Sequence, residues 1–209
     1  QEIYSDPSYF GQIIINTSSH IGNYGTINSE QESNSPQVNG VIINEYSVVY
    51  SRYNSTSSLE DYLLKNKTVA ICDVETRKLV KYVRDKGAMN AIISSENLDI
   101  SFLKQKLKKV PSMINLELSS RVTTKKEYMY GDESAKYKVA VLDLGCKKSI
   151  LNNFTNRNVI CKVFPAKTSF NKMNEWKPNG FFISNGPGDP ASMDYAVETI
   201  KKILEINKP

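Results

Sequence analysis

The 209-residue sequence is poor in the side chains that most enzymes use for acid–base and metal chemistry. It has one histidine, so a Ser-His-Asp or Cys-His mechanism confined to this chain would have to use His20. Its three cysteines form no C-x-x-C pair and indicate neither a disulfide framework nor a zinc site, so we expect no metal. The cytosol is the simplest compartment for this cysteine usage.

Long apolar runs and strong charge are also missing. No stretch approaches 18 apolar residues, so no membrane span is expected. The formal net charge of +5 is too small for a dedicated nucleic-acid binder. The sequence begins with Gln1 and shows no secretory leader, and we interpret it as a fragment of a longer protein. Its 40% hydrophobic content is that of a globular chain, long enough for one large domain or two small ones.

The first half of the chain mixes strand and helix patterns. Residues 1–36 are rich in turn formers and are predicted to be mostly loop. β-Branched and aromatic residues predict strands at 38–50, 68–72 and 91–93, and we expect 68–72 to be buried, with Cys72 in the core. Helical spacing and capping residues predict helices at 57–65, at 76–86 with Gly87 as the C-cap, and at 98–109.

A polar stretch at 119–136 separates this half from a regular alternation of strands and helices. We interpret 121–136 as a linker whose basic cluster is a solvated surface. Apolar runs predict strands at 138–144, 159–164 and 181–184, and helices at 149–156, 169–176 and 194–206. The last helix should present one apolar face, formed by Ala196, Val197, Ile200, Ile203 and Leu204.

The alternation specifies a doubly wound parallel sheet. Three strands ending at an unpaired edge are a poor stopping point, and residues 208–209 fall where a fourth strand should begin. The predicted fold class is therefore α/β: a mixed α/β domain over 1–120, incomplete at its start, the linker, and the first half of a doubly wound domain over 137–209.

Ligands of open parallel sheets bind beyond the carboxyl ends of the strands, which here lead into loops at 143–146, 165–167 and 184–190. The third loop is rigid, because Pro187 and Pro190 fix φ while Gly186 and Gly188 allow unusual backbone conformations. Its N–H donors are those of the two glycines, and such a loop is a natural part of an oxyanion hole. The alternative is a tight turn in which Asp189 or Ser192 caps the next helix.

Other polar residues have simpler interpretations. Cys146 follows a glycine at a strand end, but lysines rather than a second glycine follow it, so a catalytic role is not expected. Cys161 lies within an apolar strand and is expected in the core. His20 lies in a polar loop and is expected to make a structural hydrogen bond. We expect Asp73, Glu75 and Arg77 to cap a helix start and form an ion pair among themselves. The alternative is that they contact a partner subunit or another domain.

Motifs along essentially the whole chain resemble one enzyme family. The string ISNGPGDP at 183–190 resembles the glycine-rich oxyanion loop of class I glutamine amidotransferases. Other stretches resemble the small (glutaminase) subunit of carbamoyl-phosphate synthase, whose amino-terminal domain is specific to that family. These stretches are QEI at 1–3, SDPSY at 5–9, SHIGNYG at 19–25, AICDVETRKL at 70–79, RDKGA at 84–88, LDLGCKKSIL at 142–151 and DYA at 194–196.

The resemblance implies a reaction and two partners. The family's small subunit hydrolyses L-glutamine and passes ammonia to a large synthetase subunit, which uses bicarbonate and ATP to make carbamoyl phosphate for pyrimidine and arginine synthesis. It implies glutamine-binding positions at Ser8, Gly186 and Gly188, with the N–H of Gly186 facing the developing oxyanion. No cofactor is expected in this chain, since ATP and Mg²⁺ belong to the large subunit, and neither a nucleic acid nor a membrane is an expected partner.

The family's catalytic groups are not in this sequence. The nucleophile is a cysteine in a G-x-C-x-G-x-Q elbow, and its base is a histidine oriented by a glutamate; all three are expected after Pro209, so this fragment alone is expected to be inactive. Three alternatives remain: an amidotransferase for guanylate or anthranilate synthesis, an incomplete glutaminase-like module that only binds a partner, and a nucleic-acid-binding domain. The first 130 residues argue against the first, and only the net charge suggests the last.

Overall fold

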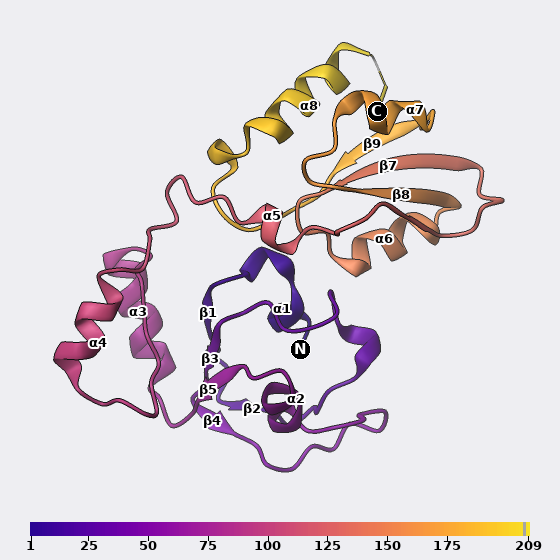
Figure 1. Cartoon of the computed structure of the whole chain (residues 1–209). Helices are drawn as coiled ribbons and strands as arrows, with labels where there is room; N and C mark the ends of the chain where they lie inside the picture. Colours follow the sequence, from indigo (N-terminus) through magenta and orange to yellow (C-terminus); the bar gives the residue numbers. More distant parts are fainter. Residues whose placement is uncertain (207) are drawn as a thin grey trace. The chain divides into compact units, whose positions relative to one another are not determined.

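The structure is a computed structural model that describes residues 1–206 and 208–209. It divides into two compact units, Gln1–Ser112 (unit 1) and Met113–Pro209 (unit 2). Figure 1 shows the elements of each unit along the chain. No helix within the described residues is both long and apolar enough to span a bilayer.

Unit 1 contains two small parallel sheets and short helices. Strands β1, β3 and β5 form one sheet with β3 at its centre, and β2 pairs with β4 in the other. The bounds are α1 Glu2–Ser5, η1 Pro7–Tyr9 (a 3-10 helix), β1 Ile13–Ile15, β2 His20–Ile21, η2 Asn28–Glu30, β3 Gly40–Ile42, β4 Glu45–Tyr46, α2 Leu59–Lys65, β5 Val69–Ile71, α3 Thr76–Lys86 and α4 Ile100–Leu107.

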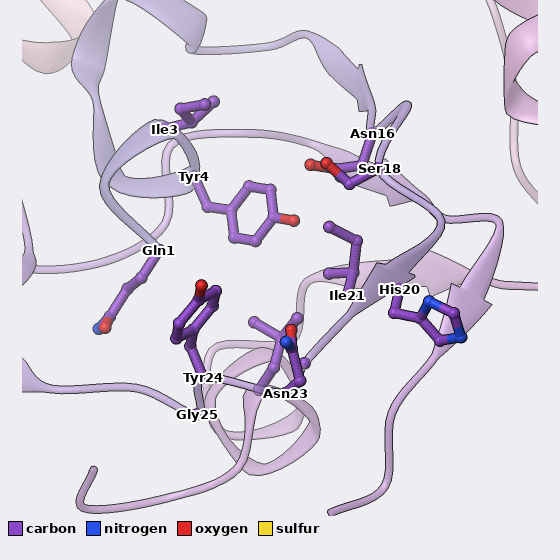
Figure 2. A pocket seen from close by; sticks show the side chains of 12 residues that line it. Gln1, Ile3, Tyr4, Asn16, Ser18, His20, Ile21, Asn23, Tyr24 and Gly25 are labelled. Atoms are coloured by element: carbon purple, nitrogen blue, oxygen red, sulfur yellow. The ribbon is translucent and has the colours of Figure 1, made fainter. Parts of the chain in front are cut away.

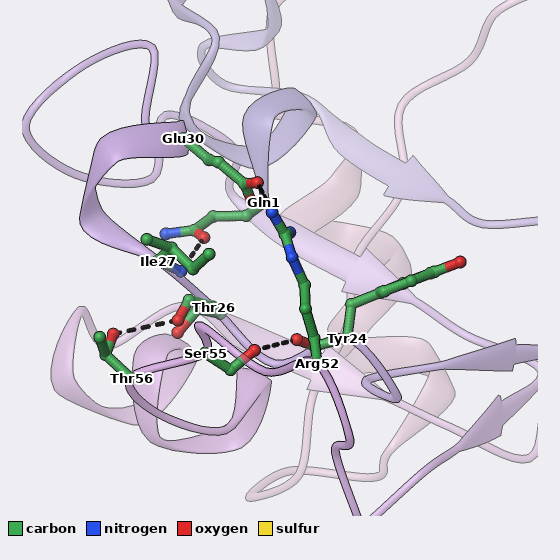
Figure 3. A network of polar contacts seen from close by, with 8 residues as sticks. All are labelled: Gln1, Tyr24, Thr26, Ile27, Glu30, Arg52, Ser55 and Thr56. Carbon is green, nitrogen blue, oxygen red and sulfur yellow. Dashed lines mark hydrogen bonds and ion pairs between the residues drawn. The ribbon is translucent and has the colours of Figure 1, made fainter.

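Side-chain hydrogen bonds hold the loop-rich start of unit 1 in place. The side-chain oxygen of Gln1 accepts from the Ile27 N–H at 2.7 Å, and Thr56 Oγ1 donates to the Thr26 carbonyl at 3.0 Å. An ion pair joins Arg52 to Glu30 (Figure 3). These bonds link segments that lie far apart in the sequence, and they explain how a region with little regular structure keeps one shape.

Several predictions for unit 1 need correction. The strand expected at 38–50 is two strands, β3 and β4, and residues 91–93 form none. Strand β5 forms as predicted but is exposed, because it pairs only with β3 in this sheet. Cys72 directly follows it and is exposed as well, so its prediction as a core residue is wrong. Helices α2 and α3 match their predictions, with Ser58 capping α2 and Gly87 ending α3 at φ +88°.

Unit 2 contains one four-stranded sheet in the order β6-β8-β7-β9. Its three longer strands are parallel, and β6 pairs with β8 antiparallel. The bounds are α5 Ser119–Val122, β6 Tyr128–Tyr130, β7 Tyr137–Asp143, α6 Lys148–Thr155, β8 Val159–Pro165, α7 Phe170–Glu175, β9 Gly180–Ile183, η3 Pro190–Ser192 and α8 Asp194–Glu205.

Strand alternation places the core of unit 2 on both faces of this sheet. Ala140 and Leu142 of β7 pack with Met173 of α7 and Ala196 of α8, whereas Val141 packs with Leu151 of α6 on the opposite face. Figure 1 shows α6 on one side of the sheet and α7 with α8 on the other. The doubly wound arrangement predicted from the alternation is confirmed.

Two details of unit 2 differ from the sequence analysis. The segment predicted as a linker contains β6, so the edge of the sheet beside β8 is covered by an antiparallel strand. Helix α8 buries Ala196, Thr199 and Ile203, whereas Leu204 is 76% exposed, so the apolar face predicted for this helix is only partly buried. At the end of the sheet beside β9, the Phe181 N–H donates to the Pro209 carbonyl at 2.8 Å, so residue 209 lies beside β9, where the sequence analysis expects a fourth strand.

A substitution at the centre of this sheet checks the core assignment. Phe164 is completely buried, so Phe164→Ala should lower the free energy of unfolding by about 3–5 kcal/mol, measured by denaturant titration. Leu204→Ala on the exposed side of α8 is the control and should change it by less than about 0.5 kcal/mol. Equal effects would contradict the core described here.

Candidate functional site

The glycine-rich loop at 184–190 follows β9, and neither of its two glycines has room for a side chain. A Cβ on Gly186 would lie 2.0 Å from the Leu144 carbonyl oxygen, and a Cβ on Gly188 would lie 2.4 Å from that of Leu116. Gly188 also has φ +89°, which disfavours any L side chain. Pro187 between them is completely buried. The loop is therefore held between two backbone segments, and each glycine is required by a close approach.

The backbone N–H groups of both glycines are left available. Within residues 1–206 and 208–209, neither the Gly186 N–H nor the Gly188 N–H donates a hydrogen bond. Two rigid, unpaired N–H groups beyond the end of a parallel strand are what an oxyanion hole requires, because the donors need no reorganisation when negative charge develops. Asp189 accepts from the Ala191 N–H and caps the 3-10 helix η3, whereas α8, the helix predicted to follow the loop, has Met193 at its N-cap and no side-chain cap.

Residues 115–124, here called the strap, cross all three strand-end loops of unit 2. At the third loop, the Asn115 N–H donates to the Asp189 carboxylate and the Asp189 N–H donates to the Leu116 carbonyl, both at 2.9 Å. At the second loop, the Ala166 N–H donates to Thr123 Oγ1 at 2.9 Å. The strap thus fixes the loops relative to one another, although sequence analysis assigned part of it to a linker.

Asp143 fixes the strap to the first loop. This buried carboxylate accepts from the N–H groups of Gly145 and Cys146 at 2.9 and 2.7 Å through one oxygen. Its other oxygen accepts from the Thr124 N–H at 2.7 Å. A buried charge is tolerated when it has several such donors. Sequence analysis missed this role, although an aspartate at the end of an apolar strand was the available signal.

Glu117, near the middle of the strap, bonds it to α8. The Tyr195 hydroxyl donates to the Glu117 carboxylate at 2.7 Å, as does the Ser120 N–H at 2.8 Å. Lys167 lies 5.7 Å from the centre of the Tyr195 ring. Burial would raise the pKa of Glu117, but the bonds from Ser120 and Tyr195 outweigh it and hold this pKa below its usual range. Glu117 is therefore a charged anchor for the segment that contacts Gly188.

The predicted site residues lie in both units. Ser8 lies in η1 of unit 1, where its N–H donates to the Asp6 carboxylate at 2.9 Å. Gly186 and Gly188 lie in the loop after β9 in unit 2. The two glycines are brought together by that loop, and the role predicted for Ser8 stays a prediction.

The remaining candidates have structural partners. Cys161 is completely buried, and burial raises the pKa of its thiol to about 11, as expected of a core residue. The Cys146 thiol donates to the Lys147 carbonyl at 3.6 Å. Glu75 pairs with Lys78 rather than with Arg77. Among the described residues, no group of histidine, cysteine and acidic side chains could hold a metal ion.

His20 borders a separate cavity of about 210 Å³ in unit 1, which Tyr4 and Ile21 also line. Its imidazole contacts the Glu45 carboxylate at 3.2 Å and the Ser19 hydroxyl at 3.1 Å, so the structural hydrogen bond predicted for it is confirmed. Figure 2 shows the ring turned away from Tyr4. Burial raises the pKa of Tyr4 to about 12, which keeps its phenol neutral. Tyr4 is therefore not an activated base in this cavity.

Replacing Gly188 tests whether its close contact with the strap matters. Gly188→Ala should cost about 1–2 kcal/mol for its backbone conformation and about 1–3 kcal/mol more for the collision with Leu116. Gly87→Ala is a matched control, because Gly87 has φ +88° but open space around it. Denaturant unfolding of both variants separates the two costs, and equal losses would show that the strap does not restrict the loop.

The bonds to Glu117 should also appear in the pH dependence of stability. Because the folded pKa is lowered, its contribution is present above the unfolded pKa of about 4.3 and is lost as pH falls through the folded value. Wild type should therefore exceed Glu117→Gln in stability near pH 6, and the gap should close on acidification. Glu205→Gln, at an exposed position of α8, serves as the control. A gap that is independent of pH would contradict the anchoring charge.

Comparisons with known proteins match this architecture. Residues 1–93 match the family model of the carbamoyl-phosphate synthase small chain, CPSase domain, and residues 140–209 match that of glutamine amidotransferase class-I.

Similar proteins are the carbamoyl phosphate synthase small chains of Chlorobaculum tepidum (39% identical over 99% of this chain), Vibrio vulnificus (38% over 100%) and Escherichia coli K12 (35% over 100%). The chain spans 57% of the first relative's length and 59% of the other two. With these matches, the amino-terminal part of the chain belongs to the carbamoyl-phosphate synthase small-chain family and its carboxyl-terminal part to the class I glutamine amidotransferases.

Proposed function

We propose that this chain is part of the small subunit of a glutamine-hydrolysing carbamoyl-phosphate synthase. In this proposal the complete subunit releases ammonia from L-glutamine and delivers it to a large synthetase subunit, in the cytosol, for pyrimidine and arginine synthesis. ATP and Mg²⁺ act on the large subunit. The observation that carries the proposal is the clamped loop with two available N–H groups, in a chain whose amino-terminal part matches the small-chain domain.

Each of these residues has its own role in the proposed reaction. Attack of a nucleophile on the glutamine side-chain carbonyl turns its oxygen into an oxyanion, and the Gly186 N–H donates to that oxygen. Gly188 shapes the same loop, and Ser8 hydrogen-bonds the bound glutamine. The nucleophilic cysteine, its histidine base and the glutamate that orients the base are proposed to follow Pro209. His20 is the one imidazole of this sequence, and its contacts with Glu45 and Ser19 support a structural role.

The alternative is an incomplete glutaminase-like module that binds a partner without hydrolysing glutamine. The coding sequence beyond Pro209 distinguishes the two. A G-x-C-x-G-x-Q elbow within the next dozen or so codons, followed by histidine and glutamate, would support the enzyme. A stop codon, or an elbow without cysteine, would leave the partner-binding module.

Activity provides the second test. The complete coding region, expressed with its large subunit, should release ammonia from glutamine, whereas residues 1–209 alone should release none. In the complete subunit, Gly186→Ala should lower kcat roughly 100-fold or more, because the added Cβ would collide with the Leu144 carbonyl and displace the donor. Gly87→Ala is the control and should leave kcat unchanged. An unchanged rate for Gly186→Ala would show that the loop is only a turn.

A further inference from the structure

The positive charge of the chain is concentrated in one segment of unit 1. Residues 76–112, here called the α3–α4 segment, contain nine of the 27 basic residues and three of the 22 acidic ones. The segment therefore carries a formal charge of +6, and the rest of the chain carries −1. All nine basic side chains are exposed. The mild net charge of the whole sequence hides this local excess.

Most of these cations have no acidic partner. Lys78 pairs with Glu75 and Arg84 approaches Asp85 at 3.8 Å. Across residues 1–206 and 208–209, the four lysines of the α4 region and Lys81 of α3 form no ion pair. Lys104 and Lys108 are four residues apart, a spacing at which like charges destabilise a helix. An acidic surface placed against this segment would relieve that repulsion.

The same segment exposes aliphatic side chains. Leu98 and Ile100 are 75% and 66% exposed at the start of α4, and Met89 and Ile92 are also exposed. Among the described residues, α4 has no buried side chain and α3 has one, Thr76. Exposed apolar side chains within a charged segment are typical of an interaction site.

The segment nevertheless has a defined attachment to unit 1. The Ile93 side chain packs over Gly40 of β3, where it would lie 3.2 Å from an added Cβ. The Asn90 side chain donates to the Val110 carbonyl at 2.9 Å and so ties the two ends of the connection around α4. Asp99 caps α4 by accepting from the N–H of Ser101 at 2.8 Å. The charges and apolar side chains are thus presented from a fixed frame.

We propose that the α3–α4 segment is the docking surface for an acidic, partly apolar face of a partner protein. The proposal rests on the proposed function, under which that partner is the large synthetase subunit. A protein face fits better than a nucleic acid, because the exposed aliphatic side chains of Met89, Leu98 and Ile100 would find no apolar partner on a phosphate backbone.

Charge reversal tests the surface in the 209-residue chain. Lys104→Glu combined with Lys108→Glu should weaken binding to the purified large subunit at least roughly tenfold at low salt, and by less at high salt. Leu98→Ser should weaken binding at both salt concentrations. Both changes lie at exposed positions, so circular dichroism should show an unchanged fold. Calorimetric titration gives the dissociation constants.

Lys125→Glu combined with Lys126→Glu is the matched control, because it makes the same charge change at exposed lysines of unit 2. Its dissociation constant should stay within about twofold of wild type. If the control pair weakens binding as much as the α4 pair, or if neither does, the surface is wrong while the partnership stands. A wild-type chain that does not bind the large subunit contradicts the proposed function and the surface with it. Tighter binding to a duplex DNA oligonucleotide than to the large subunit, lost in the α4 pair, would replace the protein partner with a nucleic acid.

Discussion

Unit 2 depends on the hydrogen bonds that residues 115–124 form across the ends of its three parallel strands. A parallel sheet leaves each strand to end in a separate loop. The Leu144 N–H donates to Ser184 Oγ at 2.8 Å and joins the first loop to the third, but a common frame for all three loops needs a further constraint. The strap supplies that constraint through Asp143, Ala166 and Asp189. Each bond joins a backbone N–H to a side-chain oxygen, so it defines both a distance and a direction. The shape of the glycine-rich loop follows from this frame.

This frame explains why the loop needs glycine twice. At Gly186 the neighbouring chain is the end of β7, and at Gly188 it is the strap. Both approaches are to backbone carbonyl oxygens, which cannot turn aside as a flexible side chain can. The same crowding holds the N–H groups of the loop in one orientation, and catalysis of acyl transfer gains from donors that are already in place.

The sequence was most informative where one kind of force dominates. Buried apolar runs with a helix between them identified β7, β8 and β9, because burial on both faces leaves a continuous pattern that few other structures share. It failed where partners are distant in the chain. Strand β6 is only three residues long and lies within a polar stretch, so no local pattern marks it, and it is stabilised by pairing with β8. The strap's bonds join residues such as Asn115 and Asp189, which no local pattern connects. The exposed position of Cys72 likewise depends on which strands lie beside β5.

The pairing of β6 also has a consequence for the order in which unit 2 forms. Strand β6 precedes β7 in the chain but pairs with β8, so it gains its partner strand only after β8 has been synthesised. During synthesis β6 is therefore made before its partner strand, and it remains unpaired until β8 has been made. Its short length and its flanking charges, including the Glu127 that pairs with Lys162 at 3.1 Å, limit association with other chains during that interval. The strand at this edge of the sheet is thus made well before the strand that pairs with it.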